Sequence, residues 1–150
     1  MILSLNIKNL SVKGDKNYMK SHETSVKVRY AETDQMGVVH HSIYPQYLEI
    51  ARLNWLDTLG ISYKSMEEEG IMLPVFELNL KYHKPVTFDE KIRIETRLRE
   101  EPNVKIIFDY SLYNEQGNLV TTGYTVLVFM DAKTRKPVRC PKYMLEALGY

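Results

Sequence analysis

A change of hydrophobic period divides this chain, from helical spacing in its first half to strict alternation in its second half. Residues 43–59 carry apolar side chains on nearly every side of a helix, with Pro45 in the first turn and Gly60 just past the end. From residue 76 onward, apolar and polar residues alternate with the period of strands. A helix that is apolar on most sides must be buried. The pattern therefore predicts an α+β fold, in which an antiparallel sheet wraps around one long helix.

The other predicted elements are short and separated by turns. The first is a strand at 24–31, in which Val26, Val28 and Tyr30 form the buried face. The long strand at the end of the series is apolar on both faces in its second half, which predicts a central position. The remaining elements, in chain order, are a short helix at 63–69, strands at 76–83, 92–99 and 104–112, a hairpin turn at 114–118, the long strand at 119–131, and a terminal helix at 141–148.

Composition narrows the class of protein. A chain of 150 residues with 44% hydrophobic and 26% charged residues is typical of one globular domain. The net charge of +1 argues against binding to nucleic acid, and no apolar run reaches the roughly 20 residues of a membrane span. Cys140 is the only cysteine and has no partner for an internal disulfide, which fits a reducing cytoplasm.

The N-terminal residues differ from the rest of the chain. Residues 13–17 are polar and turn-prone, and no hydrophobic period crosses them. We therefore predict an N-terminal extension at residues 1–18 and a folded domain at residues 19–150, with Met19 as a candidate natural start.

Residues 30–44 place a carboxylate, a turn glycine and two adjacent histidines just before the long helix. Backbone N–H groups at a helix N-terminus can stabilise an oxyanion, and an acid or imidazole can act on a nucleophile, so the segment could serve acyl transfer. From the residues alone, a turn-forming role is the favoured reading of Asp34. The pair His40–His41 could suggest a metal, but neighbouring side chains of an extended segment point to opposite sides. We find no Cys/His/carboxylate cluster with zinc-ligand spacing, and predict no metal site.

The spacing within this segment resembles the YbgC-type branch of the 4-hydroxybenzoyl-CoA thioesterases, which are acyl-CoA thioesterases of the hotdog fold. The resemblance covers roughly residues 23–148. It implies a curved antiparallel sheet around one long central helix, and hydrolysis of acyl-CoA without a metal or organic cofactor. It also implies a homodimer joined edge to edge, often a dimer of dimers (a homotetramer), with active sites at the subunit interface. The positions that carry it are Tyr30, Thr33, Asp34, Gly37, Val38, Val39, His41, Tyr44, Glu49 and Arg52.

The resemblance assigns catalytic roles to two residues. Asp34 matches the catalytic aspartate, which either attacks the thioester carbonyl to give a mixed anhydride or acts as general base on a water. His41 matches the histidine that orients water or substrate, or assists proton transfer to the departing thiolate. His40 is the weaker catalytic candidate. The N–H groups of residues 40–44 are the source from which an oxyanion contact would come.

Other residues are candidates for contact with substrate. Gly37 would supply a positive φ or a close approach to the acyl carbonyl, although an ordinary tight turn predicts the same residue. Glu49 could lie near the thioester, but an i,i+3 ion pair with Arg52 is the favoured reading. The residues predicted to bind substrate are Gly37, Val38, Val39, Tyr44 and Glu49.

A basic turn at Lys133, Arg135 and Lys136 could bind the CoA phosphates, although such a turn is more often simply solvated. Cys140 is expected to be a small buried residue. A covalent role for its thiol is poorly supported, since no histidine is near it in the sequence.

These observations predict an acyl-CoA thioesterase that releases free acid and CoA, with an acyl carrier protein as the other candidate carrier. Two rivals stay open. A hotdog hydratase or dehydratase would change double-bond absorbance without releasing thiol. A non-catalytic acyl-CoA-binding module would bind its ligand stoichiometrically without turnover.

Overall fold

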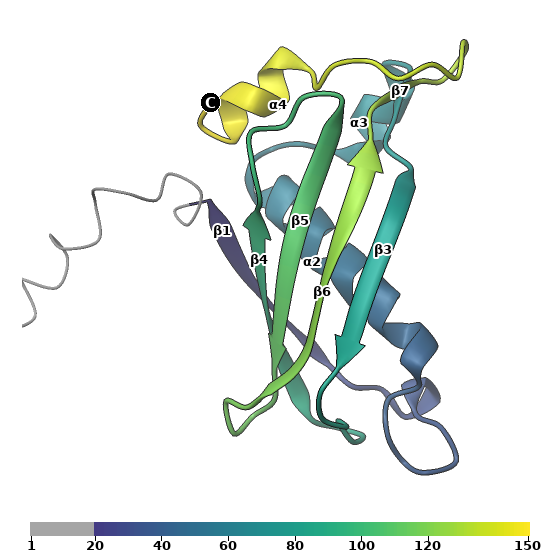
Figure 1. The fold of residues 1–150 in the computed structure, drawn as a ribbon, viewed down its shortest axis with the longest axis vertical. Coiled ribbons are helices and arrows are strands. Elements are labelled where there is room, and N and C mark those ends of the chain that lie inside the picture. Colours follow the sequence, from purple (N-terminus) through teal and green to yellow (C-terminus); the bar gives the residue numbers. More distant parts are fainter. Residues whose placement is uncertain (1–19) are drawn as a thin grey trace, which may run out of the picture.

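The computed structural model describes residues 20–150, in which a curved antiparallel sheet wraps around one long helix (Figure 1). The N-terminal extension predicted at residues 1–18 lies outside the described residues, so the predicted boundary with the folded domain stays a prediction. The elements are β1 Ser21–Lys27, η1 Tyr30–Glu32, η2 His41–Ile43, α2 Tyr44–Thr58, α3 Tyr63–Glu68, β2 Ile71–Met72, β3 Val75–Tyr82, β4 Lys91–Leu98, β5 Lys105–Tyr113, β6 Leu119–Val128, β7 Met130–Asp131 and α4 Lys142–Ala147.

The main sheet has five strands in the order β1-β4-β5-β6-β3, and every neighbouring pair is antiparallel. Strands β1 and β3 are its two edges, while β2 and β7 form a separate pair. Helix α2 lies across the concave face of the sheet (Figure 1). The predicted hotdog arrangement is thus confirmed.

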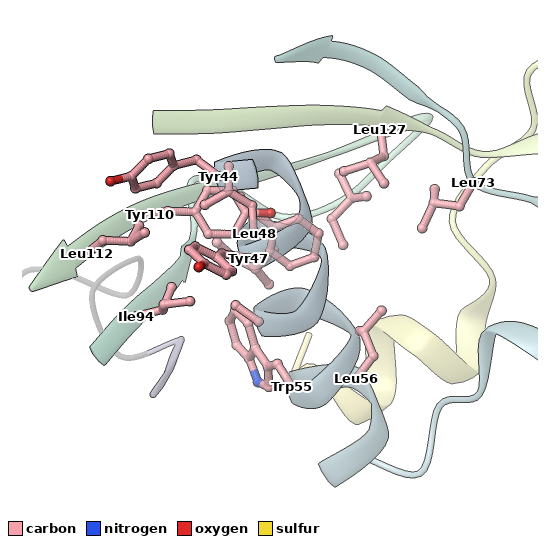
Figure 2. Packing of buried hydrophobic residues seen from close by; sticks show 14 of the residues in the cluster. Tyr44, Tyr47, Leu48, Trp55, Leu56, Leu73, Ile94, Tyr110, Leu112 and Leu127 are labelled. Carbon is pink, nitrogen blue, oxygen red and sulfur yellow. The ribbon is translucent and has the colours of Figure 1, made fainter. Parts of the chain in front are cut away.

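The core forms where one face of α2 meets the sheet (Figure 2). The opposite face of the helix is open, and Ile50 on it is 45% exposed. The prediction that α2 is buried on most sides is therefore wrong, because the sheet covers only one side of it. The buried helix residues are Tyr44, Tyr47, Leu48, Ala51, Arg52, Trp55 and Leu56.

Two predicted strands have different bounds in the structure. The first ends at Lys27 rather than residue 31, and Tyr30 is 77% exposed because the chain turns into η1. The strand predicted at 119–131 divides at Phe129, which belongs to neither β6 nor β7. Beyond this residue β7 pairs with β2. Strand β6 is interior, between β5 and β3, as predicted.

The two ends of the described domain are tied together. Lys20 Nζ donates to the carbonyl of Leu148 at 2.6 Å and lies 3.5 Å from the ring centroid of Tyr150. This contact joins the start of β1 to the end of α4. Among residues 20–150, no helix combines the length and the apolar character needed to cross a membrane.

Gly123 allows strand β3 to lie close to β6. A Cβ atom at this position would overlap the carbonyl oxygen of Asn79 on β3. We therefore expect Gly123→Ala to lower the free energy of unfolding by about 1–3 kcal/mol, because the two strands must separate to admit the methyl group. Urea denaturation measures this change. The neighbouring substitution Thr122→Ala removes one exposed hydrogen bond to His83 and should cost less than about 1 kcal/mol. Equal losses in the two variants would contradict the packing argument.

Candidate active site

The segment that carries the sequence motif is a closed loop, residues 33–40, here called the motif loop. Thr33 and Val39 face each other in an antiparallel bridge at its base. Inside the loop, Asp34 N–H donates to Val38 O at 2.8 Å, and Gly37 N–H donates to Asp34 O at 3.0 Å. Gly37 has φ +77°, a conformation that favours glycine, as the sequence predicted.

The side chain of Asp34 both shapes the loop and leaves an oxygen free. Its Oδ1 accepts hydrogen bonds from the N–H groups of Met36 at 2.8 Å and Val38 at 3.4 Å. This is the Asx turn that the sequence offered as the alternative to a catalytic role. Its Oδ2 has no hydrogen-bond partner within the described part of the chain. The carboxylate is therefore oriented through one oxygen while the other is available for chemistry.

A buried carboxylate, Glu32, anchors the motif loop to helix α2. Glu32 is only 5% exposed, and its Oε1 accepts from Arg29 N–H at 2.8 Å and from the Tyr47 hydroxyl at 2.9 Å. Its Oε2 accepts from Arg29 Nε at 3.2 Å. Burial, and then the hydrogen bond to Glu32, raise the pKa of Tyr47 above its usual range. The sequence reasoning missed Glu32, although the spacing Arg29-x-x-Glu32 is compatible with such a reciprocal cap.

The two histidines occupy the turn that leads into α2. His40 N–H donates to Glu32 O at 2.9 Å, and His40 Nδ1 accepts from Ser42 N–H at 3.1 Å. The rings of His40 and His41 lie 4.2 Å apart between centroids, tilted by 30°. The expectation that they point to opposite sides is wrong, because His41 begins η2 instead of continuing an extended segment. Residues 20–150 nevertheless contain no group of three or more His, Cys, Asp or Glu side chains arranged to hold a metal.

The backbone of His41 differs from that of its neighbours in its hydrogen bonds. Its carbonyl accepts a hydrogen bond from the Tyr82 hydroxyl at 2.9 Å. The N–H groups of His40, Ser42 and Ile43 all have acceptors, but no atom of residues 20–150 accepts from the His41 N–H. This N–H lies at the start of η2, the single turn that leads into the 15-residue helix α2, whose N-terminus favours negative charge.

Two cavities meet at the motif loop, and Asp34 and His41 line both of them. The first has a volume of about 760 Å³ and is also lined by Tyr30, Ala31, Thr33, Gln35, Met36 and His40. The second has a volume of about 310 Å³, and its lining likewise mixes apolar and polar side chains. Besides the two shared residues, it is formed by Val38, Val39, Tyr44, Tyr82, His83, Lys84 and Pro85.

The structure brings together most, but not all, of the predicted site residues. Val38, Val39 and Tyr44 join Asp34 and His41 around the second cavity, with Val39 and Tyr44 buried in its floor. Burial raises the pKa of the Tyr44 phenol. Tyr82 and Lys84, which arrive from β3 and the segment after it, were not among the predicted site residues.

Glu49 lies away from both cavities. Its side chain is 61% exposed and pairs with Arg52 at 3.6 Å, the i,i+3 ion pair that the sequence favoured. Arg52 itself is only 5% exposed, and its Nε has no hydrogen-bond partner within the described residues. Among residues 20–150, Glu49 is thus the one carboxylate that forms an ion pair with the buried Arg52.

The basic turn is distant from the motif loop. Lys133, Arg135 and Lys136 are exposed, as predicted, but the turn lies at the opposite end of the long axis (Figure 1). It lines neither cavity. Cys140 is buried, and burial raises the pKa of its thiol to about 12, so the thiol stays protonated near neutral pH.

Comparison with known proteins identifies the family. The family model of the thioesterase-like superfamily matches residues 28–148. The chain belongs to this superfamily. The resemblance found in the sequence is thereby confirmed, and the family is one of thioester hydrolases. The motif loop and its two cavities are the candidate active site of such an enzyme.

Individual relatives agree with this membership. YneP of Bacillus subtilis strain 168, provisionally assigned as an acyl-CoA thioesterase, is 32% identical over 83% of this chain and 90% of its own length. The acyl-acyl carrier protein thioesterase ATL3 of Arabidopsis thaliana, a chloroplastic protein, is 32% identical over 87% of this chain and 68% of its own. A solved DHNA-CoA thioesterase from Staphylococcus aureus superimposes with a TM-score of 0.80. It is 38% identical and covers 85% of this chain and 87% of its own.

Tyr47→Phe tests the anchor of the motif loop. The substitution leaves Oε1 of a buried carboxylate without one of its donors, so we expect the free energy of unfolding to fall by about 1–3 kcal/mol. Urea denaturation provides the measurement. Tyr63→Phe is the matched control, because the Tyr63 hydroxyl is buried and has no hydrogen-bond partner among residues 20–150. A loss as large in the control as in Tyr47→Phe would argue against the anchor.

Proposed function

We propose that this protein hydrolyses acyl-CoA thioesters, with Asp34 as nucleophile or general base and His41 as its assistant. The observation that carries the proposal is the meeting of two cavities at these two side chains. A thioester has two arms, the acyl group and the thiol carrier, that diverge from one carbonyl carbon. A carbonyl held between Asp34 and His41 would have one cavity for each arm.

Two routes are compatible with this geometry. Oδ2 of Asp34 can attack the thioester carbonyl, so that the C–S bond breaks, the thiolate leaves and a mixed anhydride forms. Water then cleaves the anhydride and restores the carboxylate. Alternatively Asp34 accepts a proton from a water whose oxygen attacks the carbonyl directly. In either route the His41 N–H is the proposed donor to the developing oxyanion, since it has no acceptor within residues 20–150.

The sizes of the two cavities support an assignment of the two arms, the larger to the thiol carrier and the smaller to the acyl group. The second cavity, floored by Val39 and Tyr44, suits an acyl group of modest size, either short or aromatic. The first cavity, with Thr33 and Gln35, offers polar partners for the amides of a pantetheine arm. The DHNA-CoA thioesterase from Staphylococcus aureus makes aromatic acyl-CoA a substrate class to test first.

Acyl carrier protein is the second candidate carrier, because the relative ATL3 is named for that substrate. Binding of the CoA phosphates by Lys133, Arg135 and Lys136 also stays a prediction, since that turn is exposed and lines neither cavity of the same chain. A reducing cytoplasm is the proposed compartment, in keeping with a single cysteine.

The catalytic role of Asp34 can be measured by release of free thiol from short-chain, long-chain and aromatic acyl-CoAs and from the matching acyl carrier protein thioesters. We expect Asp34→Asn to lower turnover by about 10²- to 10⁴-fold while the loop stays folded, because the amide oxygen can still accept from Met36. Asp89→Asn is the control, since Asp89 is exposed, its one ion-pair partner among residues 20–150 is Lys27, and it has a positive φ that asparagine tolerates.

Near-normal turnover in a folded Asp34→Asn variant would overturn the assignment. No thiol release from any substrate would favour one of the two rivals. A change in double-bond absorbance would then indicate a hydratase or dehydratase, and stoichiometric binding without turnover would indicate a binding module.

The proposed homodimer forms through the free edge strand β3. Several of its apolar side chains are exposed, with Val75 48%, Phe76 70% and Leu78 42% exposed, and polar side chains alternate with them. An open, apolar edge invites pairing with another strand, and pairing of two copies would place the partner beside the second cavity. A dimer of dimers is the larger assembly that we propose as an alternative.

Phe76→Lys tests this interface by light scattering after size-exclusion chromatography. We expect the variant to shift toward monomer at micromolar concentration, because a charge replaces an apolar side chain at the edge. Leu119→Lys is the control, since Leu119 is also exposed but lies at the hairpin end of β6. A monomeric wild type, or an unchanged mass in Phe76→Lys, would speak against pairing through β3.

A further inference from the structure

The hydroxyl of Tyr82 joins the edge strand of the sheet to the turn that precedes helix α2. Tyr82 is the last residue of β3 and lies 41 positions after His41, to whose carbonyl it donates at 2.9 Å. Both residues line the second cavity together with Asp34. No other side chain of residues 20–150 donates to this carbonyl.

The backbone of His41 is held on one side by the motif loop and on the other by Tyr82. On the N-terminal side, His40 is fixed through Glu32 O and through Ser42 N–H. On the C-terminal side, the Tyr82 hydroxyl holds the carbonyl. The His41 N–H belongs to the peptide group that precedes this residue, and the His41 carbonyl to the peptide group that follows it. The preceding group is held through the His40 carbonyl, which accepts from Ile43 N–H at 3.0 Å, and the following group is held by Tyr82. Together the two contacts oppose changes in the φ and ψ angles of His41 that would redirect its N–H, the proposed oxyanion donor.

The tyrosine is itself well placed to act as a rigid support. Its ring packs edge-on against the ring of Tyr44, with centroids 5.2 Å apart, and Tyr44 is 3% exposed. Figure 2 shows Tyr44 at the edge of the buried cluster around α2. Within the sheet, Tyr82 is in register with Thr121 of β6. The hydroxyl is therefore carried by a ring that is packed on one side and by a backbone that is paired.

We propose that Tyr82 is a positioning residue, whose hydroxyl restrains the backbone on the C-terminal side of His41 so that the His41 N–H points at the carbonyl of the bound thioester. This inference rests on the proposed thioesterase function. An oxyanion contact strengthens as charge develops in the transition state, so its misalignment lowers kcat and leaves substrate binding almost unchanged. Loss of alignment at a reacting centre by about 1 Å can reduce the rate by about 10²-fold.

The test compares Tyr82→Phe with Tyr124→Phe. Each substitution removes one hydroxyl and keeps its ring, but Tyr124 lies on β6 and donates to Glu77 at 2.6 Å, away from the motif loop. With the best substrate of the wild type, we expect kcat of Tyr82→Phe to fall about ten- to hundredfold at unchanged KM. Tyr124→Phe should match the wild type. An unchanged kcat, or a rise in KM alone, would overturn the proposal.

A second readout separates alignment from general damage. In the Asp34→Asn background, the carbonyl stretch of a bound acyl thioester, measured by infrared difference spectroscopy, reports how strongly the N–H polarises the carbonyl. We expect a smaller downshift when Tyr82→Phe is added, and no change when Tyr124→Phe is added. Equal frequencies in the two double variants would overturn the role of Tyr82. The frequency decides this point even if the wild type releases no thiol, which would instead count against the proposed function.

Discussion

Burial of one face of helix α2 against the antiparallel sheet holds the other elements in place. A fully buried large apolar side chain contributes roughly 1.5–3 kcal/mol, against about 0.5–1.5 kcal/mol for one hydrogen bond. Tyr47, Leu48 and Leu56 are all at most 1% exposed, so this packing outweighs any single polar contact of the site. Once the helix is fixed, so is the turn at its N-terminus. The position of His41 is thus a consequence of core packing.

Polar contacts then refine what packing has positioned. Glu32 connects the motif loop to α2 through Tyr47, and Tyr82 connects the turn before α2 to the sheet edge. The site is therefore held from the helix and from the sheet. Asp34 contributes to its own placement, because one carboxylate oxygen closes the loop. The same side chain thus has a structural role beside its proposed chemical role, and the sequence alone presented the two as alternatives.

The period of the hydrophobic residues predicted most of the fold, since helix α2 and strands β3 to β6 all follow it. It failed where the chain changes partners. Phe129 is apolar and buried, as Leu127 and Val128 before it are. The hydrophobic pattern therefore does not indicate where β6 ends and β7 begins. Tyr30 continued the alternation of β1, but hydrogen bonds between Arg29 and Glu32 turn the chain before it. Local pattern cannot report such contacts.

The candidate site likewise contains residues that the sequence could predict and a residue that it could not. Asp34, His41 and Tyr44 are close in sequence, so a motif could group them. Tyr82 reaches the site only because β3 folds back beside the motif loop, and a strand tyrosine carries no signal of that contact. The basic turn at 133–137 was grouped with the site on charge alone, whereas the topology sends it to the other end of the molecule (Figure 1).

The contact of Lys20 with the end of α4 has a practical consequence for handling the protein. Because Lys20 holds Leu148, the C-terminal residue Tyr150 lies at the end of the molecule away from the motif loop (Figure 1). A tether attached after Tyr150 would present the two cavities outward, toward solution. Attachment to a sensor surface through this terminus should therefore leave the site accessible to ligands as large as a carrier protein.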